Sequence, residues 1–468
     1  MARHPFNVFL AVAFALSVSV VMAGPGNTAQ QDAIAFVGGT VIDGTMADPI
    51  SDAIIIVAGD RIEQVGRAAA LDLPEGVQTI NVTGKWLIPG LVDAHVHFFQ
   101  SASLYTRPDV IDLRRVRPYA EETTWIRNRI PLTLARYIAS GVTSVVDLAG
   151  PTWTFEVRDY ALRSQPSPRV LVTGPGLAPT TPKALMTDDS PGVTVRTPRE
   201  AREQVGRLLE RKSDLLKIWF PYSSDMDLDQ EMEWVRAAVE AAHAHELRVA
   251  AHATQRELAR EMVRAGVDIL VHSVDDVPVD DAFVNLLSAR DTLYITTLVV
   301  GEGYQEVLGQ HVSLTGIERR VGDPEVIASF ADLPRLFPWI RRTPVTRPDS
   351  VALKNLKRLQ DAGVTVVAGS DAGNIGTLHG PALHRELELM HTACLTPKEI
   401  LVAATSGGAK VMGREGELGT IEPGKLADFV ILDADPLIDI RNTRRIHRVV
   451  KGGKIYDPDE ILKNLSSR

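Results

Sequence analysis

The stretch LVDAHVHFF, residues 91–99, carries the clearest indication of the fold. It follows the apolar lead-in WLIPG, residues 86–90, and resembles a buried strand that three polar side chains interrupt. Side chains alternate between the two faces of a strand, so Asp93, His95 and His97 point the same way. A lone histidine in an apolar run is usually a hydrogen-bonded core residue, but two imidazoles buried side by side are costly unless something binds them. The pair is either core packing or part of a ligand site, and the rest of the chain must distinguish the two.

The composition is that of a globular protein. The chain has 468 residues, of which 45% are hydrophobic and 23% are charged, a length that allows a large core. The net charge is −9 and the basic residues are scattered, so nucleic acid is not expected as a partner. Cys394 is the only cysteine, which excludes an internal disulfide and CxxC or thiolate metal sites.

The N-terminal residues have the features of a secretory signal peptide. A basic start precedes an apolar run from Val8 to Met22, and Ala23 offers a small side chain before Gly24. The run is shorter than the roughly 20 apolar residues that a transmembrane helix needs. We expect a signal peptide over residues 1–23, cleaved after Ala23, and a secreted or periplasmic mature chain without an integral membrane span. An uncleaved anchor is the lesser alternative.

Short β-rich runs broken by turns occur at both ends of the chain. They extend from about Ala33 to Val82, and the same style returns in GTIEPGKLADFVILDADP and IHRVVKGGKIYD. Two such fragments are predicted to close one small β-sandwich domain, formed from residues 24–88 and 415–468. The dipeptide Pro89-Gly90 marks the passage into the domain between them, residues 89–414.

Apolar strand-like runs alternate with amphipathic helical patterns in this middle domain. Near-continuous Val, Ile and Leu runs are typical of parallel strands that are buried on both faces. The seven runs after the opening strand are residues 141–148, 169–174, 214–220, 247–253, 267–274, 293–299 and 364–372. The amphipathic stretches include residues 198–212, 228–246, 255–265 and 350–362. Eight β/α units in series predict an α/β fold of the (β/α)8 TIM-barrel type rather than an open doubly wound sheet.

Two connections are long, residues 174–197 and about 300–348. Both are expected to leave the carboxyl-terminal face of the barrel, where active sites form. Tyr304, Phe337 and Trp339 in the second connection are candidates for a pocket wall, and packing of the loop against itself is an equal alternative.

Six polar residues interrupt the apolar runs near the ends of five predicted strands. The eight strand ends of a barrel meet around one centre, so these side chains are predicted to converge. They are His95, His97, Lys217, His252, His272 and Asp371. Imidazole and carboxylate groups suit a divalent ion such as Zn²⁺, although manganese, iron and nickel accept the same ligands.

Lys217 is the unusual member of this set. An ammonium group in a barrel core beside metal cations would be desolvated and repelled. A neutral lysine amine can instead react with carbon dioxide to form a carbamate, which is a carboxylate-like bridge between two metals. Pairing with Asp147 or Asp371 is the structural alternative.

The motifs LIPGLVDAHVHF, AAHA, VHSV, GSDAG and LGTIEPGKLADFVILDADP, together with Lys217, resemble the amidohydrolase superfamily. The resemblance spans essentially the whole mature chain and is greatest for the imidazolonepropionase and Xaa-Pro dipeptidase-like branch of metal-dependent hydrolases. It implies a (β/α)8 barrel beside a small β-sandwich. It also implies two divalent metals, with His95, His97 and Asp371 on one, His252 and His272 on the other, and N-carboxylated Lys217 between them.

The chemistry implied by this resemblance is hydrolysis of an amide or peptide C–N bond by a metal-bridging hydroxide. Catalytic roles are expected for Asp371, as proton carrier, and for Lys217 and His272. Tyr222 and His379 are candidates for substrate contacts, each with a structural alternative. We interpret four further histidines, His243, His245, His384 and His391, as structural or exposed, and Asp93 as a support for the strand or for a ligand histidine.

The expected substrates are small molecules, namely dipeptides or N-acyl amino acids. The same site would also serve a cyclic amide, as in imidazolonepropionase, or an ester or lactone. A barrel that binds metal without catalysis is the remaining alternative, and the complete set of candidate ligands argues against it. The sequence leaves homo-oligomerisation open.

Overall fold

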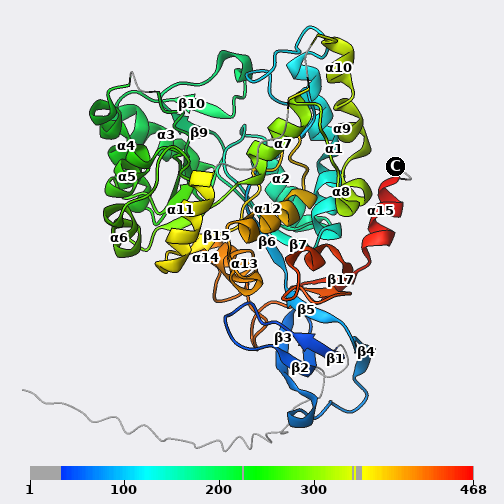
Figure 1. The fold of residues 1–468 in the computed structure, drawn as a ribbon. Coiled ribbons are helices and arrows are strands. Elements are labelled where there is room, and N and C mark those ends of the chain that lie inside the picture. The colour runs from blue at the N-terminus through cyan, green and yellow to red at the C-terminus, as the bar shows by residue number, and fades with distance from the viewer. Residues whose placement is uncertain (1–32, 224–225, 340–341, 344–349, 467–468) are drawn as a thin grey trace, which may run out of the picture.

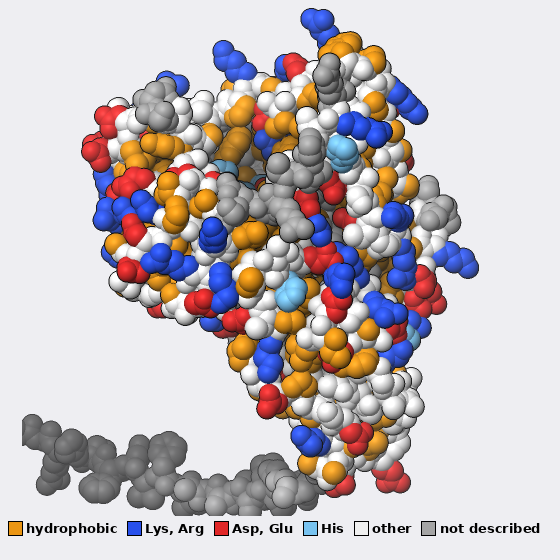
Figure 2. All heavy atoms as spheres, viewed as in Figure 1, with side chains coloured by type: hydrophobic (Ala, Val, Ile, Leu, Met, Phe, Trp, Pro, Cys, Tyr) orange, Lys and Arg blue, Asp and Glu red, His pale blue; other side chains and the backbone are white. Residues whose placement is uncertain are grey.

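The computed structural model describes residues 33–223, 226–339, 342–343 and 350–466. The predicted signal peptide, residues 1–23, lies outside the described residues. Within the described ranges, no helix combines the length and the apolar character that crossing a membrane requires. On the face of the molecule shown in Figure 2, basic and acidic side chains are interspersed.

The two ends of the chain form one eight-stranded sheet, as predicted. Its strands run in the order β18-β17-β16-β5-β1-β2-β3, with β4 paired to β1. The first part contributes β1 (Ala33–Val41), β2 (Ile50–Ala58), β3 (Arg61–Arg67), β4 (Gln78–Asn81) and β5 (Trp86–Pro89), and the second contributes β16 (Phe429–Leu432), β17 (Ile446–Lys451) and β18 (Lys454–Tyr456). The antiparallel pair β5 and β16 joins the two parts, with Leu87 opposite Ile431. Figure 1 shows this sheet below the larger domain, next to the point where the chain enters it.

The middle of the chain is the predicted barrel of parallel strands. Its strands are β6 (Leu91–Val96), β7 (Val142–Asp147), β8 (Arg169–Val172), β9 (Gly176–Ala178), β10 (Gly192–Thr194), β11 (Leu216–Ile218), β12 (Val249–His252), β13 (Ile269–Val271), β14 (Leu293–Ile295) and β15 (Val366–Val367). The third predicted strand corresponds to β8, which pairs with β7, whereas β9 lies in the long connection after it and pairs with β11 and β10. The ring closes between the last and first strands, where the Ala94 N–H donates to the Ala368 carbonyl at 3.2 Å and the His97 N–H to the Ala372 carbonyl at 2.8 Å.

Helices connect the barrel strands. They include α1 (Tyr119–Ala139), α2 (Thr154–Arg163), α3 (Pro198–Glu210), α4 (Leu228–His243), α5 (Arg256–Arg264), α6 (Asp281–Ala289) and α11 (Ser350–Asp361). After the last strand follow α12 (Pro381–Thr392), α13 (Pro397–Ala403) and α14 (Ser406–Met412), and α15 (Pro458–Ser466) packs back against α1. The start of α3 shows how local sequence sets these bounds: Thr197 accepts from the Glu200 N–H, and Pro198 occupies the first turn.

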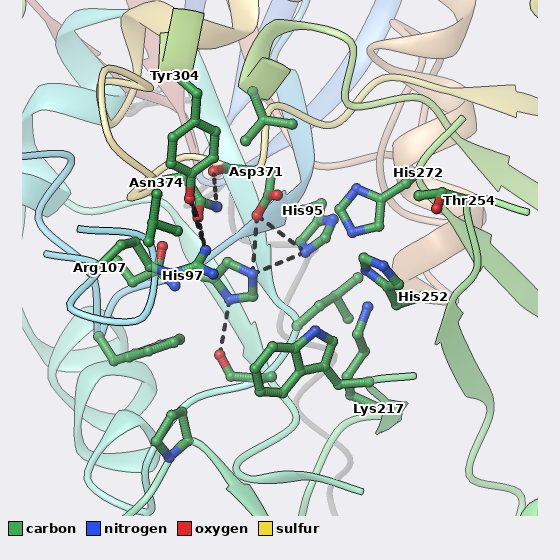
Figure 3. Close-up of a pocket in the computed structure, with 18 of the residues that line it drawn as sticks. His95, His97, Arg107, Lys217, His252, Thr254, His272, Tyr304, Asp371 and Asn374 are labelled. Carbon is green, nitrogen blue, oxygen red and sulfur yellow. Dashed lines mark hydrogen bonds and ion pairs between the residues drawn. The ribbon is translucent and has the colours of Figure 1, made fainter. Parts of the chain in front are cut away.

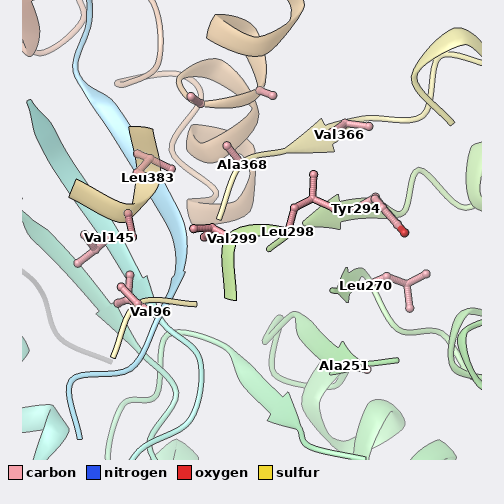
Figure 4. Packing of buried hydrophobic residues seen from close by; sticks show 14 of the residues in the cluster. Val96, Val145, Ala251, Leu270, Tyr294, Leu298, Val299, Val366, Ala368 and Leu383 are labelled. Atoms are coloured by element: carbon pink, nitrogen blue, oxygen red, sulfur yellow. The ribbon is translucent and has the colours of Figure 1, made fainter. Parts of the chain in front are cut away.

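The barrel strands pack outward against these helices. Figure 4 shows side chains of one buried cluster, which includes Val145, Leu270 and Val366 of three strands, Leu383 of α12 and Val299 of α7 (Val299–Leu308). The alternate positions Ile269 and Val271 belong to a separate buried cluster with Ala250 and Leu293 of the neighbouring strands. The strand residues therefore alternate between two apolar environments, as strands buried on both faces require.

The two long connections have structure of their own. The first contains β9 and β10, and the second contains α7, α8 (Gly316–Val321), α9 (Pro324–Ser329) and α10 (Asp332–Leu336). The second connection was expected to be a loop, but its residues up to Leu336 form four short helices. Leu333 and Val326 pack there against Leu104 and Ile375 of two other loops.

Candidate active site

A cavity of about 500 Å³ lies at the carboxyl ends of the barrel strands. All six polar residues that the sequence predicts to converge line it, together with apolar side chains such as Trp219. We call these six residues the histidine wall: His95, His97, Lys217, His252, His272 and Asp371. Figure 3 shows them facing the same space from different strands.

The first strand presents two of these residues. His95 is 1% exposed, and its Nε2 lies 3.2 Å from Nε2 of His97. The other ring nitrogen of His97, Nδ1, lies 3.0 Å from the carbonyl oxygen of Ala149. A carbonyl oxygen can only accept, so Nδ1 carries the proton and Nε2 is left with a lone pair that faces the cavity.

Asp371 follows the last strand and completes a group of three atoms. Its Oδ1 lies 3.0 Å from Nε2 of His97 and 3.5 Å from Nε2 of His95. Its backbone has a positive φ of 56°, and its N–H donates to the His95 carbonyl at 2.7 Å. The left-handed backbone is costly for a residue with a side chain, so the surrounding contacts must hold it in place.

His252 ends β12 and His272 directly follows the neighbouring strand β13, and their ring centroids are 4.3 Å apart. His252 is opposite Val271 in the sheet, so the two point the same way and strict alternation would turn His272 away from the cavity. A positive φ of 77° at His272 interrupts the alternation, and the ring lines the cavity. Its Nδ1 lies 2.6 Å from the Thr297 hydroxyl. One ligand atom each from His95, His272 and Asp371 lie within 4.8 Å of one another.

Burial keeps these imidazoles neutral. It lowers the pKa of His252 to about 3 and the pKa values of His95 and His272 well below their ordinary value, and the nearby Lys217 adds to the effect on each. Neutral imidazole is the form that binds a metal.

Lys217 is 2% exposed, and its Nζ has no hydrogen-bond partner among the described residues. Burial lowers the pKa of its amine to about 7, against an opposing influence of Asp371. Asp147 is also buried, and burial raises the pKa of its carboxyl well above the ordinary value. Within the described part of the chain, no ion pair joins Lys217 to Asp147 or Asp371, so the geometry does not support the structural alternative for Lys217.

The unpartnered atoms suit a metal centre. Buried polar atoms normally find a hydrogen-bond partner, yet Lys217 Nζ and Asp371 Oδ1 have none in the described structure. Neutral imidazole nitrogens and a carboxylate oxygen are ligands that Zn²⁺ and similar ions take. The residues present therefore fit divalent ions.

A second part of the cavity lining adjoins Asp371, and its polar groups bond one another. We call Arg107, Tyr304 and Asn374 the arginine wall. Arg107 Nη1 donates to the Tyr304 hydroxyl at 2.9 Å and also to Asn374 Oδ1. The Tyr304 hydroxyl donates to Asn374 Oδ1 at 2.7 Å. Behind this wall, Arg107 Nε and Nη2 donate to the two carboxylate oxygens of Asp109 at 2.8 and 2.7 Å.

A family model described as "Amidohydrolase family" matches residues 86–456. The chain belongs to the amidohydrolase family. It is therefore a hydrolase that acts on carbon–nitrogen bonds, and the predicted resemblance is confirmed. The matched segment begins in β5 and ends in β18, so it takes in the whole barrel.

Individual relatives are similar over most of the chain. The imidazolonepropionase of Streptomyces griseus is 26% identical over 418 residues, which cover 84% of this chain and 88% of that protein. The imidazolonepropionase of Aromatoleum aromaticum is 26% identical over 413 residues, which cover 82% of this chain and 86% of that protein. Among solved structures, a putative prolidase from Bifidobacterium longum superposes with a TM-score of 0.68 at 25% identity, covering 93% of this chain and 99% of that one. A Xaa-Pro dipeptidase with bound methionine has the same fold, with a TM-score of 0.68 at 22% identity, covering 91% and 100%.

The two predicted substrate contacts of this amidohydrolase lie elsewhere. Tyr222 is not among the described residues that line the cavity, and it packs against the main hydrophobic core. His379 lies behind the cavity, where its Nδ1 is 2.8 Å from the Tyr137 hydroxyl and its Nε2 is 2.9 Å from the Gln100 carbonyl. Its ring stacks on Phe98 at an interplanar angle of 9°. These contacts give His379 a structural position and leave a substrate role for either residue without geometric support.

The other predictions about supporting residues agree with the structure. Asp93 accepts from the Ser370 N–H at 2.8 Å and from its hydroxyl at 2.5 Å, which ties the residue before Asp371 to the strand of the histidine pair. His384 is buried between the Thr443 hydroxyl and the Ser140 carbonyl. His243 pairs with Asp268 at 2.9 Å near the surface.

The sequence analysis missed two residues that line the cavity of this amidohydrolase, Arg107 and Asn374, and Thr297, which contacts His272. Asn374 lies three positions after Asp371, in the loop that the GSDAG motif opens, so its position was a usable signal. Arg107 and Thr297 had no comparable signal. Tyr304 does line the cavity, whereas Phe337 and Trp339 pack on each other with ring centroids 5.6 Å apart.

Proposed function

We propose that this amidohydrolase cleaves the C–N bond of a small amide with the help of two divalent metal ions. The observation that carries the proposal is the convergence of His95 Nε2, His97 Nε2 and Asp371 Oδ1 within 3.5 Å. The unpartnered amine of Lys217 and the two further histidines line the same cavity.

The six residues of the histidine wall would hold the two ions. His95, His97 and Asp371 would bind one ion, and His252 and His272 the other. When bound, two divalent ions supply hydroxide at neutral pH and polarise the substrate carbonyl. Zn²⁺ is the proposed metal because its usual ligands are imidazole nitrogen and carboxylate oxygen.

Lys217 would contribute a bridging anion. Its neutral amine attacks carbon dioxide, a C–N bond forms, and one proton is released, so the side chain becomes a carbamate with one negative charge. The buried, unpartnered Nζ supports this modification, because a carbamate would find cationic partners at a position where the amine finds none.

Asp371 is the proposed proton carrier. Its Oδ1 has no hydrogen bond in the described structure and faces the cavity between the histidine rings. It would accept the proton of the attacking water and then deliver it to the departing nitrogen, so that one carboxylate serves as base and acid in successive steps. His272, held by Thr297, would keep its Nε2 directed at the reacting centre.

Dipeptides and N-acyl amino acids stay the substrates predicted from sequence, and the names of the relatives, imidazolonepropionase and prolidase, are compatible with cyclic amides and with dipeptides. An ester or lactone would use the same site.

For the predicted signal peptide, we propose that residues 1–23 direct the chain out of the cytoplasm. N-terminal sequencing of the exported protein should then begin at Gly24.

A combined metal and substrate assay tests the proposal. Freshly purified protein should contain two metal ions per chain, and a chelator should abolish hydrolysis in a screen of dipeptides, N-acyl amino acids and cyclic imides. Lys217→Ala should lose metal and most of the rate. A variant that kept both metals and the full rate would refute the bridging role, and protein that bound no metal would refute the proposed mechanism.

A further inference from the structure

Arg107 is the one cationic side chain outside the histidine wall among the described residues that line the cavity. A cation in an active-site cavity ordinarily suggests a binding site for a substrate carboxylate. Its surroundings here point the other way, because all three guanidinium nitrogens already have partners in the protein.

The charge of Arg107 is matched by Asp109. The two side chains form a bidentate pair, with the Nη2 to Oδ2 distance at 2.7 Å and side-chain exposures of only 17% and 12%. The pair also raises the pKa of the guanidinium, so Arg107 keeps its charge and Asp109 balances it. A carboxylate that approached Arg107 would meet the field of Asp109 and, beyond Asn374, that of Asp371.

The side of Arg107 that faces the cavity is occupied as well. Nη1 is shared between the Tyr304 hydroxyl and Asn374 Oδ1, and the hydroxyl proton is itself directed at Asn374. Asn374 is held in turn by a bond from its Nδ2 to the Asp371 carbonyl at 3.0 Å. A substrate carboxylate would have to break this closed set of bonds before it gained any of its own.

The rest of the lining outside the histidine wall is mainly apolar. It includes Phe99, Val110, Leu148, Trp219, Val300 and Leu308. The cavity of about 500 Å³ is within the range of sites for small organic ligands. An uncharged, apolar group would bury surface here without losing strong hydration.

We propose that this site selects amides whose substituents are uncharged and apolar, and that Asp109 determines this preference by balancing Arg107. The inference rests on the proposed function and narrows its substrate class. It departs from the dipeptides and N-acyl amino acids predicted from sequence, because both carry a free carboxylate.

Two compounds that differ only in a carboxylate test the preference: N-acetylphenethylamine and N-acetylphenylalanine. The metal-loaded wild-type enzyme should hydrolyse the neutral compound with a kcat/KM at least about tenfold higher. Asp109→Asn should shift the ratio of the two kcat/KM values at least about tenfold towards the carboxylate. Adding Arg107→Met to Asp109→Asn should reverse that shift, since the carboxylate would lose the cation that attracts it.

Asp112→Asn is the matched control. Asp112 pairs with Arg114 through the same two-oxygen geometry, at 2.8 and 2.6 Å, in the same loop but on the exposed surface. This variant should leave the substrate ratio unchanged. The comparison separates the balancing of Arg107 from a general effect of removing one negative charge from the loop.

Binding provides a readout that does not depend on turnover. Calorimetric titration of the Asp371→Asn protein should show tighter binding of the neutral compound, and Asp109→Asn in that background should shift binding towards the carboxylate. A wild-type preference for N-acetylphenylalanine, or an unchanged ratio in Asp109→Asn, would overturn the inference. Loss of the proposed function would look different: the calorimetric preference would persist while no amide was hydrolysed.

Discussion

The two walls of the cavity differ in how their polar atoms are satisfied. In the histidine wall, the Lys217 amine and Asp371 Oδ1 are buried without a hydrogen bond in the described structure. In the arginine wall, the guanidinium, the Tyr304 hydroxyl and the Asn374 amide bond one another. Unsatisfied buried groups are costly, so the proposed metal ions would stabilise the histidine wall, whereas the polar groups of the arginine wall already satisfy one another.

The backbone shows the same contrast. His272, Thr297 and Asp371 have positive φ values of 77°, 54° and 56°. Tyr304 sits in the regular helix α7. Left-handed conformations at residues with side chains persist only where other contacts enforce them, and they gather at functional sites. Substitutions in the histidine wall should therefore change metal binding and rate, and substitutions in the arginine wall should change stability and selectivity.

The largest expected effect is that of Asp371→Asn. Loss of the proposed proton carrier should lower kcat/KM by roughly 10² to 10⁴-fold, measured on the best substrate of the amide screen. The metal-free protein should unfold at an unchanged or higher temperature, because Oδ1 contributes no hydrogen bond to the described structure. A variant with a normal rate and a much lower unfolding temperature would contradict this comparison, because it would show that the Asp371 carboxylate contributes to stability and not to the reaction.

Thr297→Val tests whether the histidine wall depends on its supporting contacts. The Thr297 hydroxyl lies 2.6 Å from His272 Nδ1, and valine preserves the shape while removing the oxygen. Loss of such a contact to a metal ligand typically costs about 10 to 100-fold in metal affinity or activity. Competition with a chromogenic chelator should show this weakening, and Thr297→Ser, which keeps the hydroxyl, should restore it.

Much of the fold could be predicted from sequence. Parallel strands buried on both faces need long apolar runs, so the eight apolar runs of the sequence predicted eight strands. The strand ends of a barrel meet around one centre, which predicted that the polar residues at those ends converge. The short helices of the second long connection also had local signals that were not used. Thr315 and Glu318 form a capping box, and Asp323-Pro324 begins the next helix.

The remainder of the site depends on tertiary contacts. Arg107 and Asn374 form a hydrogen bond although they are 267 positions apart in the sequence, and no local sequence pattern predicts that pairing. The turn of His272 into the cavity depends on its positive φ, which strand alternation does not predict. Tyr222 and His379 were chosen because they lie near predicted ligands in sequence, and that proximity does not set the direction of a side chain.

Tyr304→Phe should have a smaller effect on rate than on stability. It removes the hydroxyl between Arg107 and Asn374, so both lose a partner in a buried cluster. The free energy of unfolding should fall by about 1 to 3 kcal/mol in denaturant titrations, and kcat/KM on a neutral amide should change by less than about tenfold. A loss of rate comparable to that of Asp371→Asn would show that the Tyr304 hydroxyl takes part in the reaction.

His379→Gln should leave the rate within about twofold of wild type, since the residue lies behind the cavity, while changing how stability depends on pH. Burial lowers the pKa of His379 from 6.5 to about 4. Between these values the unfolded chain binds a proton that the folded chain does not, so stability falls as the pH falls from 6.5 towards 4. For this one residue the loss is on the order of 3 kcal/mol. Urea titrations of the metal-free proteins should give a flatter profile for His379→Gln than for wild type over this range. Parallel profiles with a reduced rate would instead support the substrate contact that the sequence offered as one of two alternatives for His379.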